Sequence, residues 1–267
     1  QEIFFRVKRM KQPTPDRPIT DAPATSGSFV ASPLRMFCGA TLIGALTLVF
    51  LYNVLFAITS ENSILVAVGT GLYLVGAALA AFRLSQGFPH PSLGLCNLVT
   101  LSRLVIVGVL GVVVMAGIPP NWATFGIAAL ALSLDGIDGW LARRQNRASD
   151  FGARFDVEVD AIFALVLAIY VATNGAAGPY VILLGLPHYL FWVARLQLPW
   201  LNQPLNPRFS FSRKAVCVFQ IGALIVLQIP FLADGRLELL IAAVTLALIC
   251  SFARDILWLW RKRRPGI

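Results

Sequence analysis

Eight long apolar segments limit what this chain can fold into more than any other feature of its sequence. They cover residues 36–58, 64–82, 98–117, 121–142, 152–173, 178–198, 214–232 and 237–260. Each segment has the length at which an apolar helix crosses a bilayer, about 18 residues or more. The mean hydropathy of +0.75 agrees with this reading. We therefore expect an all-α integral membrane protein with about eight transmembrane helices.

The basic residues indicate how these helices are oriented. The connections after the second, fourth and sixth segments carry arginine, whereas residues 117–122 and 174–178 carry no basic residue. By the positive-inside rule, both termini and the basic connections lie in the cytoplasm. The net charge of +9 therefore reflects membrane orientation, and nucleic acid is not an expected partner. Residues 1–34 are basic and lack apolar periodicity, so we expect a disordered cytoplasmic tail.

One window between the fourth and fifth segments, residues 135–160, holds six of the thirteen acidic residues. Carboxylates at membrane depth are costly, so such a cluster indicates a functional site. Its aspartates and small residues recur at helical spacing. They are Asp135, Asp138, Gly139 and Ala142 on the fourth segment, and Gly152, Asp156 and Asp160 on the fifth.

A polar connection joins the two segments, which predicts a helical hairpin open to the cytoplasm. In such a hairpin Asp135 faces Asp160, about 12 Å below the helix ends at 1.5 Å per residue. Divalent cations would relieve the repulsion among the carboxylates, and oxygen ligands favour Mg²⁺, Mn²⁺ or Ca²⁺. Two ions fit four carboxylates better than one. The small residues leave room for a phosphorylated ligand, and Arg143 at the rim can meet phosphate.

The window reads D-x2-D-G-x2-A-R-x8-G-x3-D-x3-D without a substitution. This spacing resembles the signature of the class I CDP-alcohol phosphotransferase family. Asn97, Thr100 and Arg103 resemble the N-x2-T-x2-R pattern of the same family. The resemblance implies a six-helix catalytic core over residues 93–267. Residues 35–92 would then form two extra transmembrane helices, and the protein would be a homodimer.

The resemblance also implies roles for individual residues. Asp135, Asp138, Asp156 and Asp160 would hold Mg²⁺ or Mn²⁺, and Asp160 would also be the general base. The CDP-linked substrate would be bound by Asn97, Thr100, Gly139, Ala142, Arg143 and Gly152. Arg103 would either meet phosphate or hold the acidic helix faces together.

The implied activity is the transfer of a phosphatidyl group from CDP-diacylglycerol to a small alcohol, with release of CMP. The location would be the bacterial inner membrane, with the site facing the cytoplasm. In an alternative reading, a CDP-alcohol such as CDP-choline or CDP-ethanolamine donates to diacylglycerol. In another class, a divalent cation transporter is disfavoured because the aspartates lie on one hairpin near its cytoplasmic end.

The acceptor alcohol is not determined by these motifs. Five cations could surround a phosphorylated acceptor, or could only satisfy the positive-inside rule. They are Arg154, Arg195, Arg208, Arg213 and Lys214. Family members that use glycerol 3-phosphate often carry G-K-x-K-T-x2-Q, from which this chain departs at Arg213, Val216 and Cys217. The subfamily is therefore not assigned.

Overall fold

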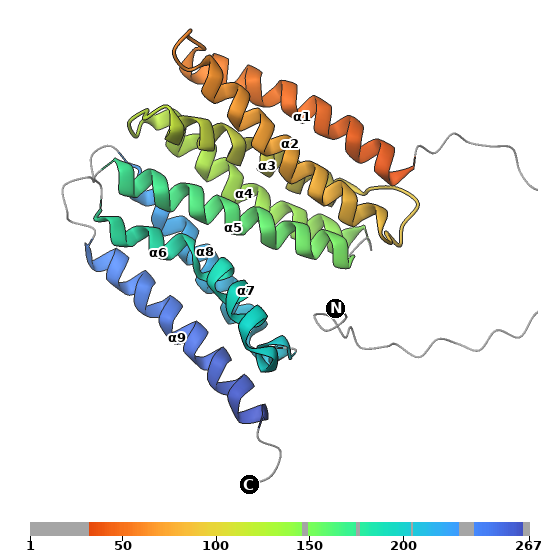
Figure 1. Ribbon diagram of the computed structural model, residues 1–267, viewed down its shortest axis with the longest axis vertical. Helices are drawn as coiled ribbons and strands as arrows, with labels where there is room; N and C mark the ends of the chain where they lie inside the picture. Colours follow the sequence, from red (N-terminus) through yellow and green to blue (C-terminus); the bar gives the residue numbers. More distant parts are fainter. Residues whose placement is uncertain (1–31, 146–148, 175–176, 204, 230–237, 264–267) are drawn as a thin grey trace, which may run out of the picture.

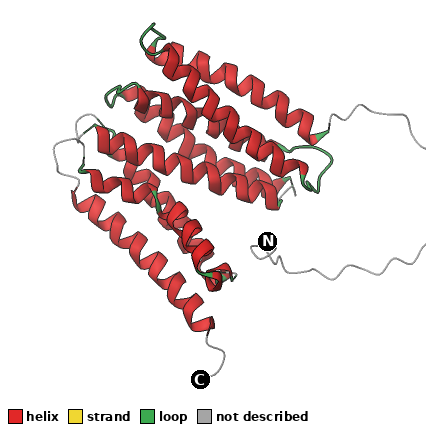
Figure 2. Ribbon diagram, viewed as in Figure 1, coloured by secondary structure: helices red, strands yellow, loops and turns green. Residues whose placement is uncertain are grey.

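The computed structural model describes residues 32–145, 149–174, 177–203, 205–229 and 238–263. These parts of the chain form nine α-helices and no strand (Figure 1, Figure 2). The helices are α1 (Pro33–Phe56), α2 (Ser63–Ser85), α3 (Leu95–Met115), α4 (Trp122–Arg144), α5 (Asp150–Thr173), α6 (Ile182–Gly185), α7 (Pro187–Gln197), α8 (Ser210–Val226) and α9 (Glu238–Arg263). Short 3₁₀ helices are η1 (Pro179–Val181), η2 (Pro199–Asn202) and η3 (Pro207–Phe209). The expected tail, residues 1–34, lies almost wholly outside the described residues.

Five of the described helices, α1, α2, α3, α4 and α9, are long and apolar enough to cross a membrane. The expected all-α membrane protein is thereby confirmed. Two expected spans form helices that do not meet the same criterion. α5 carries four of the six acidic side chains of the window, and α8 has only 17 residues. The count of eight spans thus remains a prediction that rests on the charge alternation.

The sixth apolar segment differs from the single helix expected over residues 178–198. It is bent by 63° between α6 and α7, and counts as a sixth span only if the two pieces are taken together. Pro187 is the first residue of α7. Proline lacks a backbone N–H, and its ring clashes with the carbonyl four residues earlier in a continuous helix, which accounts for a break at this point. Gly185, at the end of α6, allows a close approach to α5, because a Cβ there would lie 2.7 Å from Leu165 Cα.

Two apolar clusters hold the helices together, and α3 and α5 contribute to both. One cluster joins them to α4, α6, α8 and α9, with Leu110 and Phe163 fully buried within it. The other joins them to α1 and α2 and includes Phe37, Val109 and Phe155. Figure 1 shows the same arrangement, with α1 and α2 at one side of the bundle and α9 at the other. α3 and α5 therefore lie between the two clusters and contribute side chains to both.

The first turn of α5 is fixed from two directions. Ser149 caps the helix, because its Oγ accepts a hydrogen bond of 3.1 Å from the Gly152 amide. On the outer side, Phe37 of α1 packs edge-on against Phe151 and Phe155, with ring centroids 6.2 and 5.9 Å apart. α1 thus packs against the helix that carries four of the six acidic residues of the window.

Candidate active site

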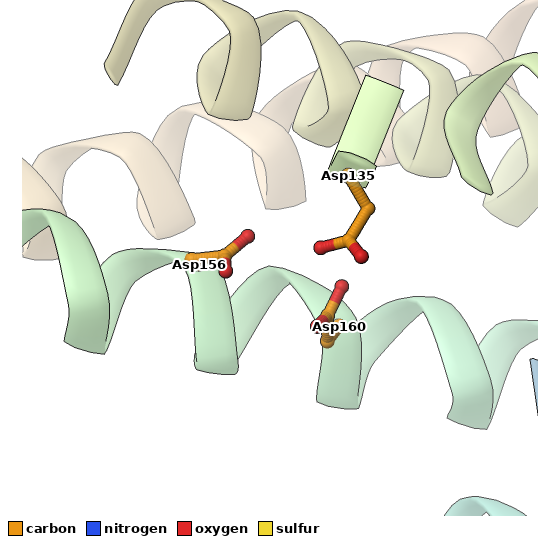
Figure 3. Close-up of side chains that lie close together, drawn as sticks. All are labelled: Asp135, Asp156 and Asp160. Carbon is orange, nitrogen blue, oxygen red and sulfur yellow. The ribbon is translucent and has the colours of Figure 1, made fainter. Parts of the chain in front are cut away.

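Three aspartates of the window come together between α4 and α5. Asp135, Asp156 and Asp160 each offer a carboxylate oxygen that lies within 4.8 Å of those of the other two. Figure 3 shows the Asp135 side chain pointing from α4 toward the two aspartates of α5. Asp135 is buried, whereas Asp156 and Asp160 are partly exposed. The described helices therefore have the facing geometry that the matched depths in the hairpin predict.

Asp138 lies outside this group of three and is held by α3. Its Oδ2 is 3.2 Å from the Thr100 hydroxyl and 3.3 Å from Arg103 Nη1, and the side chain is buried. Asp138 thus has two donors from α3 that fix the orientation of its carboxylate.

Arg103 lies at the centre of the four carboxylates and is fully buried. Its Nη1 is 3.3 Å from Asp135 Oδ1 and 2.6 Å from Asp156 Oδ1, in addition to its contact with Asp138. Its Nη2 forms an ion pair with Asp160. Of the two roles that the family pattern allows for this residue, the structure shows the one in which it joins the acidic faces of α4 and α5. A planar guanidinium with five donors suits such a position.

The charges of this cluster do not balance within the described residues. Four carboxylates face Arg103, and Lys214 Nζ lies 3.8 Å from Asp135 Oδ2, so four negative charges meet two positive ones. Asp135 Oδ1 is also buried without a hydrogen-bond partner, since its contact with Arg103 has poor hydrogen-bond geometry. An excess of negative charge and an unsatisfied carboxylate oxygen fit a hard divalent cation such as Mg²⁺ or Mn²⁺. The hydrogen bonds of Arg103 to Asp156 and Asp160 go to Oδ1 of each carboxylate, so their Oδ2 atoms are available to such an ion.

The residues expected to contact a CDP group are partly brought together. Asn97 is buried, and its Nδ2 donates to the Leu93 carbonyl over 2.5 Å. A Cβ at Gly152 would lie 2.8 Å from Asn97 Oδ1, so glycine at this position allows α5 to lie close to α3. Gly139 is half-buried on α4. The side chains of Ala142 and Arg143 lie outside the described residues.

The five cations considered for the acceptor lie in different surroundings: Arg154, Arg195, Arg208, Arg213 and Lys214. Lys214 reaches the aspartate cluster, as described above. Arg213 pairs with an acidic residue of α9 over 3.5 Å. Nε of Arg195 donates to Asn202 of η2 over 3.0 Å, and Arg154 and Arg208 are exposed. Of the five, the structure thus brings Lys214 into contact with the aspartates and links Arg213 to α9.

The acidic residue that pairs with Arg213 is Asp255, which the motif analysis does not single out. Asp255 is buried, and its Oδ1 also lies 3.7 Å from Nε of the adjacent Arg254. The sequence did contain a signal for this residue. Arg254 and Asp255 are adjacent charges inside the apolar segment 237–260, and charged groups within spanning helices are rare and often functional.

The geometry agrees with a comparison against known families. The model of the CDP-alcohol phosphatidyltransferase family matches residues 93–253, from just before α3 to a position within α9. No curated protein and no solved structure matches the chain significantly. The matched region is more than half of the 267 residues and contains every aspartate of the window. The chain therefore belongs to the CDP-alcohol phosphatidyltransferase family.

Proposed function

We propose that this protein transfers the phosphatidyl group of CDP-diacylglycerol to an alcohol acceptor and releases CMP. Membership of the family supports a membrane-embedded transferase of phosphate-containing groups. The observation that carries the proposal is the convergence of four carboxylates from α4 and α5 on the buried Arg103. Such a cluster has the charge and the ligand atoms that a metal-assisted phosphoryl transfer requires.

In this proposal Asp135, Asp138 and Asp156 hold Mg²⁺ or Mn²⁺, and Asp160 is close enough to contribute as well. A bound divalent cation would neutralise charge on the pyrophosphate and on the departing CMP. Two ions suit the four carboxylates better than one. Thr100 and Arg103 keep the carboxylate of Asp138 in place for this role.

Asp160 is the general base of the proposed reaction. Its carboxylate accepts the proton of the acceptor hydroxyl while the hydroxyl oxygen attacks the phosphatidyl phosphorus. The bond from that phosphorus to the oxygen bridging to CMP breaks, and CMP leaves with the bond's electron pair. Arg103 holds one Asp160 oxygen by an ion pair, so the carboxylate is oriented before the acceptor arrives.

The remaining parts of the proposal concern the CDP site, the orientation in the membrane and the oligomeric state. Asn97, Thr100, Gly139, Ala142, Arg143 and Gly152 line the CDP site. The site faces the cytoplasm of a bacterial inner membrane, and the protein acts as a homodimer.

A single cysteine introduced by Asn121→Cys in a cysteine-free variant tests the orientation. We expect a membrane-impermeant thiol reagent to label it only from the non-cytoplasmic side, and labelling from the cytoplasmic side would contradict the topology.

The experiment that tests the reaction uses the purified protein in lipid nanodiscs. CDP-diacylglycerol with a labelled phosphatidyl group is supplied with Mg²⁺ and a panel of acceptor alcohols, and CMP release is measured. We expect metal-dependent release that is lost in Asp160→Asn and kept in Asp150→Asn, an exposed position on the same helix.

Other outcomes would favour other functions. Incorporation of label into lipid from CDP-choline or CDP-ethanolamine alone would show that diacylglycerol is the acceptor. Flux of divalent cations across a vesicle membrane, without transfer from either donor, would identify a transporter and overturn the proposal.

A further inference from the structure

A cavity to which the proposed reaction gives no role lies at the start of α3. Its volume is about 420 Å³, within the range of cavities that hold a small organic ligand. The start of α1 and the end of α4 lie at the same end of the bundle (Figure 1), and both contribute to the cavity. The residues that line it are Met36, Ser92, Gly94, Leu95, Leu98 and Gln145.

The cavity is separate from the aspartate cluster. At 3.6 residues per turn, Leu95 and Leu98 lie about 140–160° around α3 from Thr100, whose hydroxyl contacts Asp138. α3 therefore stands between the cavity and the aspartates. Met36 and Ser92 also precede residue 93, where the match to the family begins. The cavity thus depends on α1, which lies outside the matched region.

The lining combines apolar and polar groups. Met36 and Leu95 are 37% and 54% exposed, so they present apolar surface to a ligand. Gln145 lies at the other side, where its Oε1 accepts a hydrogen bond of 3.3 Å from the Leu95 amide. Gly94 is the N-cap of α3 and supplies no side-chain cap, and the first amides of a helix carry a partial positive charge. This combination suits a ligand with an apolar part and an anionic part.

Two arginines are neighbours of lining residues in the sequence. Arg35 directly precedes Met36, Arg144 directly precedes Gln145, and both arginines are exposed. No acidic side chain of the described parts forms an ion pair with either arginine, and none lines the cavity. The guanidinium of Arg144 lies 4.9 Å from the ring centre of the half-exposed Trp140, a residue type enriched at the membrane–water interface. The surroundings of the cavity are therefore positively charged at the level of lipid head groups.

We propose that this cavity binds an anionic phospholipid of the surrounding leaflet. Met36, Leu95 and Leu98 contact the first part of the acyl chains, and burial of this apolar surface favours binding. Arg35, Arg144 and the first amides of α3 attract the negatively charged head group. A zwitterionic lipid fits less well, because no acidic lining residue meets its cationic group. The site is additional to the proposed transfer reaction and does not depend on it.

Native mass spectrometry of the full chain, released from detergent micelles, tests the site. The protein is titrated with phosphatidylglycerol and with phosphatidylcholine, and inorganic phosphate is added as a competitor; no CDP-diacylglycerol is present. Leu95→Trp fills the cavity from an exposed position, and a double variant, Arg35→Gln with Arg144→Gln, removes the two charges. The matched controls are Leu79→Trp and Arg83→Gln, both at exposed positions of α2.

We expect the wild type to bind one molecule of phosphatidylglycerol roughly 10- to 30-fold more tightly than phosphatidylcholine, the preference that two arginines at a membrane surface provide. Leu95→Trp and the double arginine variant should each lose this tight binding, whereas both controls should keep it. Asp156→Ala should keep it as well, because the aspartates lie on the other side of α3. Inorganic phosphate should not compete, since it makes no apolar contact.

Three results would overturn the site. The first is equal affinity of the wild type for the two lipids, and the second is tight binding that persists in both Leu95→Trp and the double arginine variant. The third is a loss of binding in Asp156→Ala or on addition of inorganic phosphate, which would place the lipid at the aspartates or identify a site for free phosphate. The double variant changes only exposed side chains, so it decides the matter even if Leu95→Trp does not fold.

Discussion

Replacement of Arg103 by methionine tests the electrostatic reading of the site most directly. The variant Arg103→Met keeps a long unbranched side chain but removes the only cation that contacts all four aspartates in the described structure. It also removes the hydrogen bond of 3.2 Å from Nε to the Ala131 carbonyl. The four carboxylates would then face only Lys214, and their mutual repulsion would push α4 and α5 apart.

The magnitude follows from the burial of Arg103. Removal of one partner of a buried ion pair typically costs about 3–5 kcal/mol, because the remaining charges stay buried and uncompensated. At about 2–4 °C per kcal/mol for a chain of this size, the Tm in EDTA should fall by roughly 6–20 °C. A divalent cation can replace the lost charge, and a ligand at 100 times its Kd stabilises by about 2.7 kcal/mol. Mg²⁺ should therefore raise the Tm of the variant more than that of the wild type.

The assay is thermal unfolding of the detergent-solubilised protein, once with EDTA and once with Mg²⁺. The control is Arg83→Met, at an exposed position near the end of α2. It also removes a positive charge, but from a position that is not surrounded by the four aspartates. Equal Tm values for Arg103→Met and the wild type in EDTA would refute the reasoning. So would a Mg²⁺-induced shift no larger in the variant than in the wild type.

Three further predictions follow from the described contacts. Asp156→Ala should abolish transfer and weaken Mg²⁺ or Mn²⁺ binding, measured by CMP release and by calorimetry; an active variant would contradict the metal role. Gly152→Ala should lower the free energy of unfolding by about 1–3 kcal/mol, because the added methyl group overpacks against Asn97, and should raise the KM for CDP-diacylglycerol. The control Gly111→Ala, which has open space around the added methyl group, should have little effect on stability or on KM. Phe37→Ala should destabilise the protein by about 3–5 kcal/mol in thermal unfolding, since it leaves a cavity beside α5; an unchanged Tm would show that α1 does not support that helix.

The features that sequence alone predicts here are those set by helical periodicity and charge. The spacing of the aspartates places them on facing helix sides, and a hairpin pairs Asp135 with Asp160 at equal depth. Periodicity shows which face of a helix is polar, but it does not show what lies opposite that face. The contact of Arg103 with all four aspartates and the pairing of Arg213 with Asp255 depend on helices distant in sequence, so neither could be assigned from spacing. The bend had a sequence signal in Pro187 itself, but the flanking residues are apolar enough for one continuous span, and the hydropathy pattern predicted a single helix.

The two N-terminal helices precede the region matched by the family, yet they affect the site through α5. Asp156 and Asp160 lie on one face of α5. A rotation of α5 about its own axis would therefore move both carboxylates away from Arg103. The ion pairs with Arg103 oppose such a rotation from the inner side of the helix. On the outer side, Phe155 lies next to Asp156 in sequence and packs against the fully buried Phe37 of α1. The apolar contact with α1 and the ion pairs with Arg103 therefore act on opposite sides of α5, and together they hold its first turns in register without a bound cation.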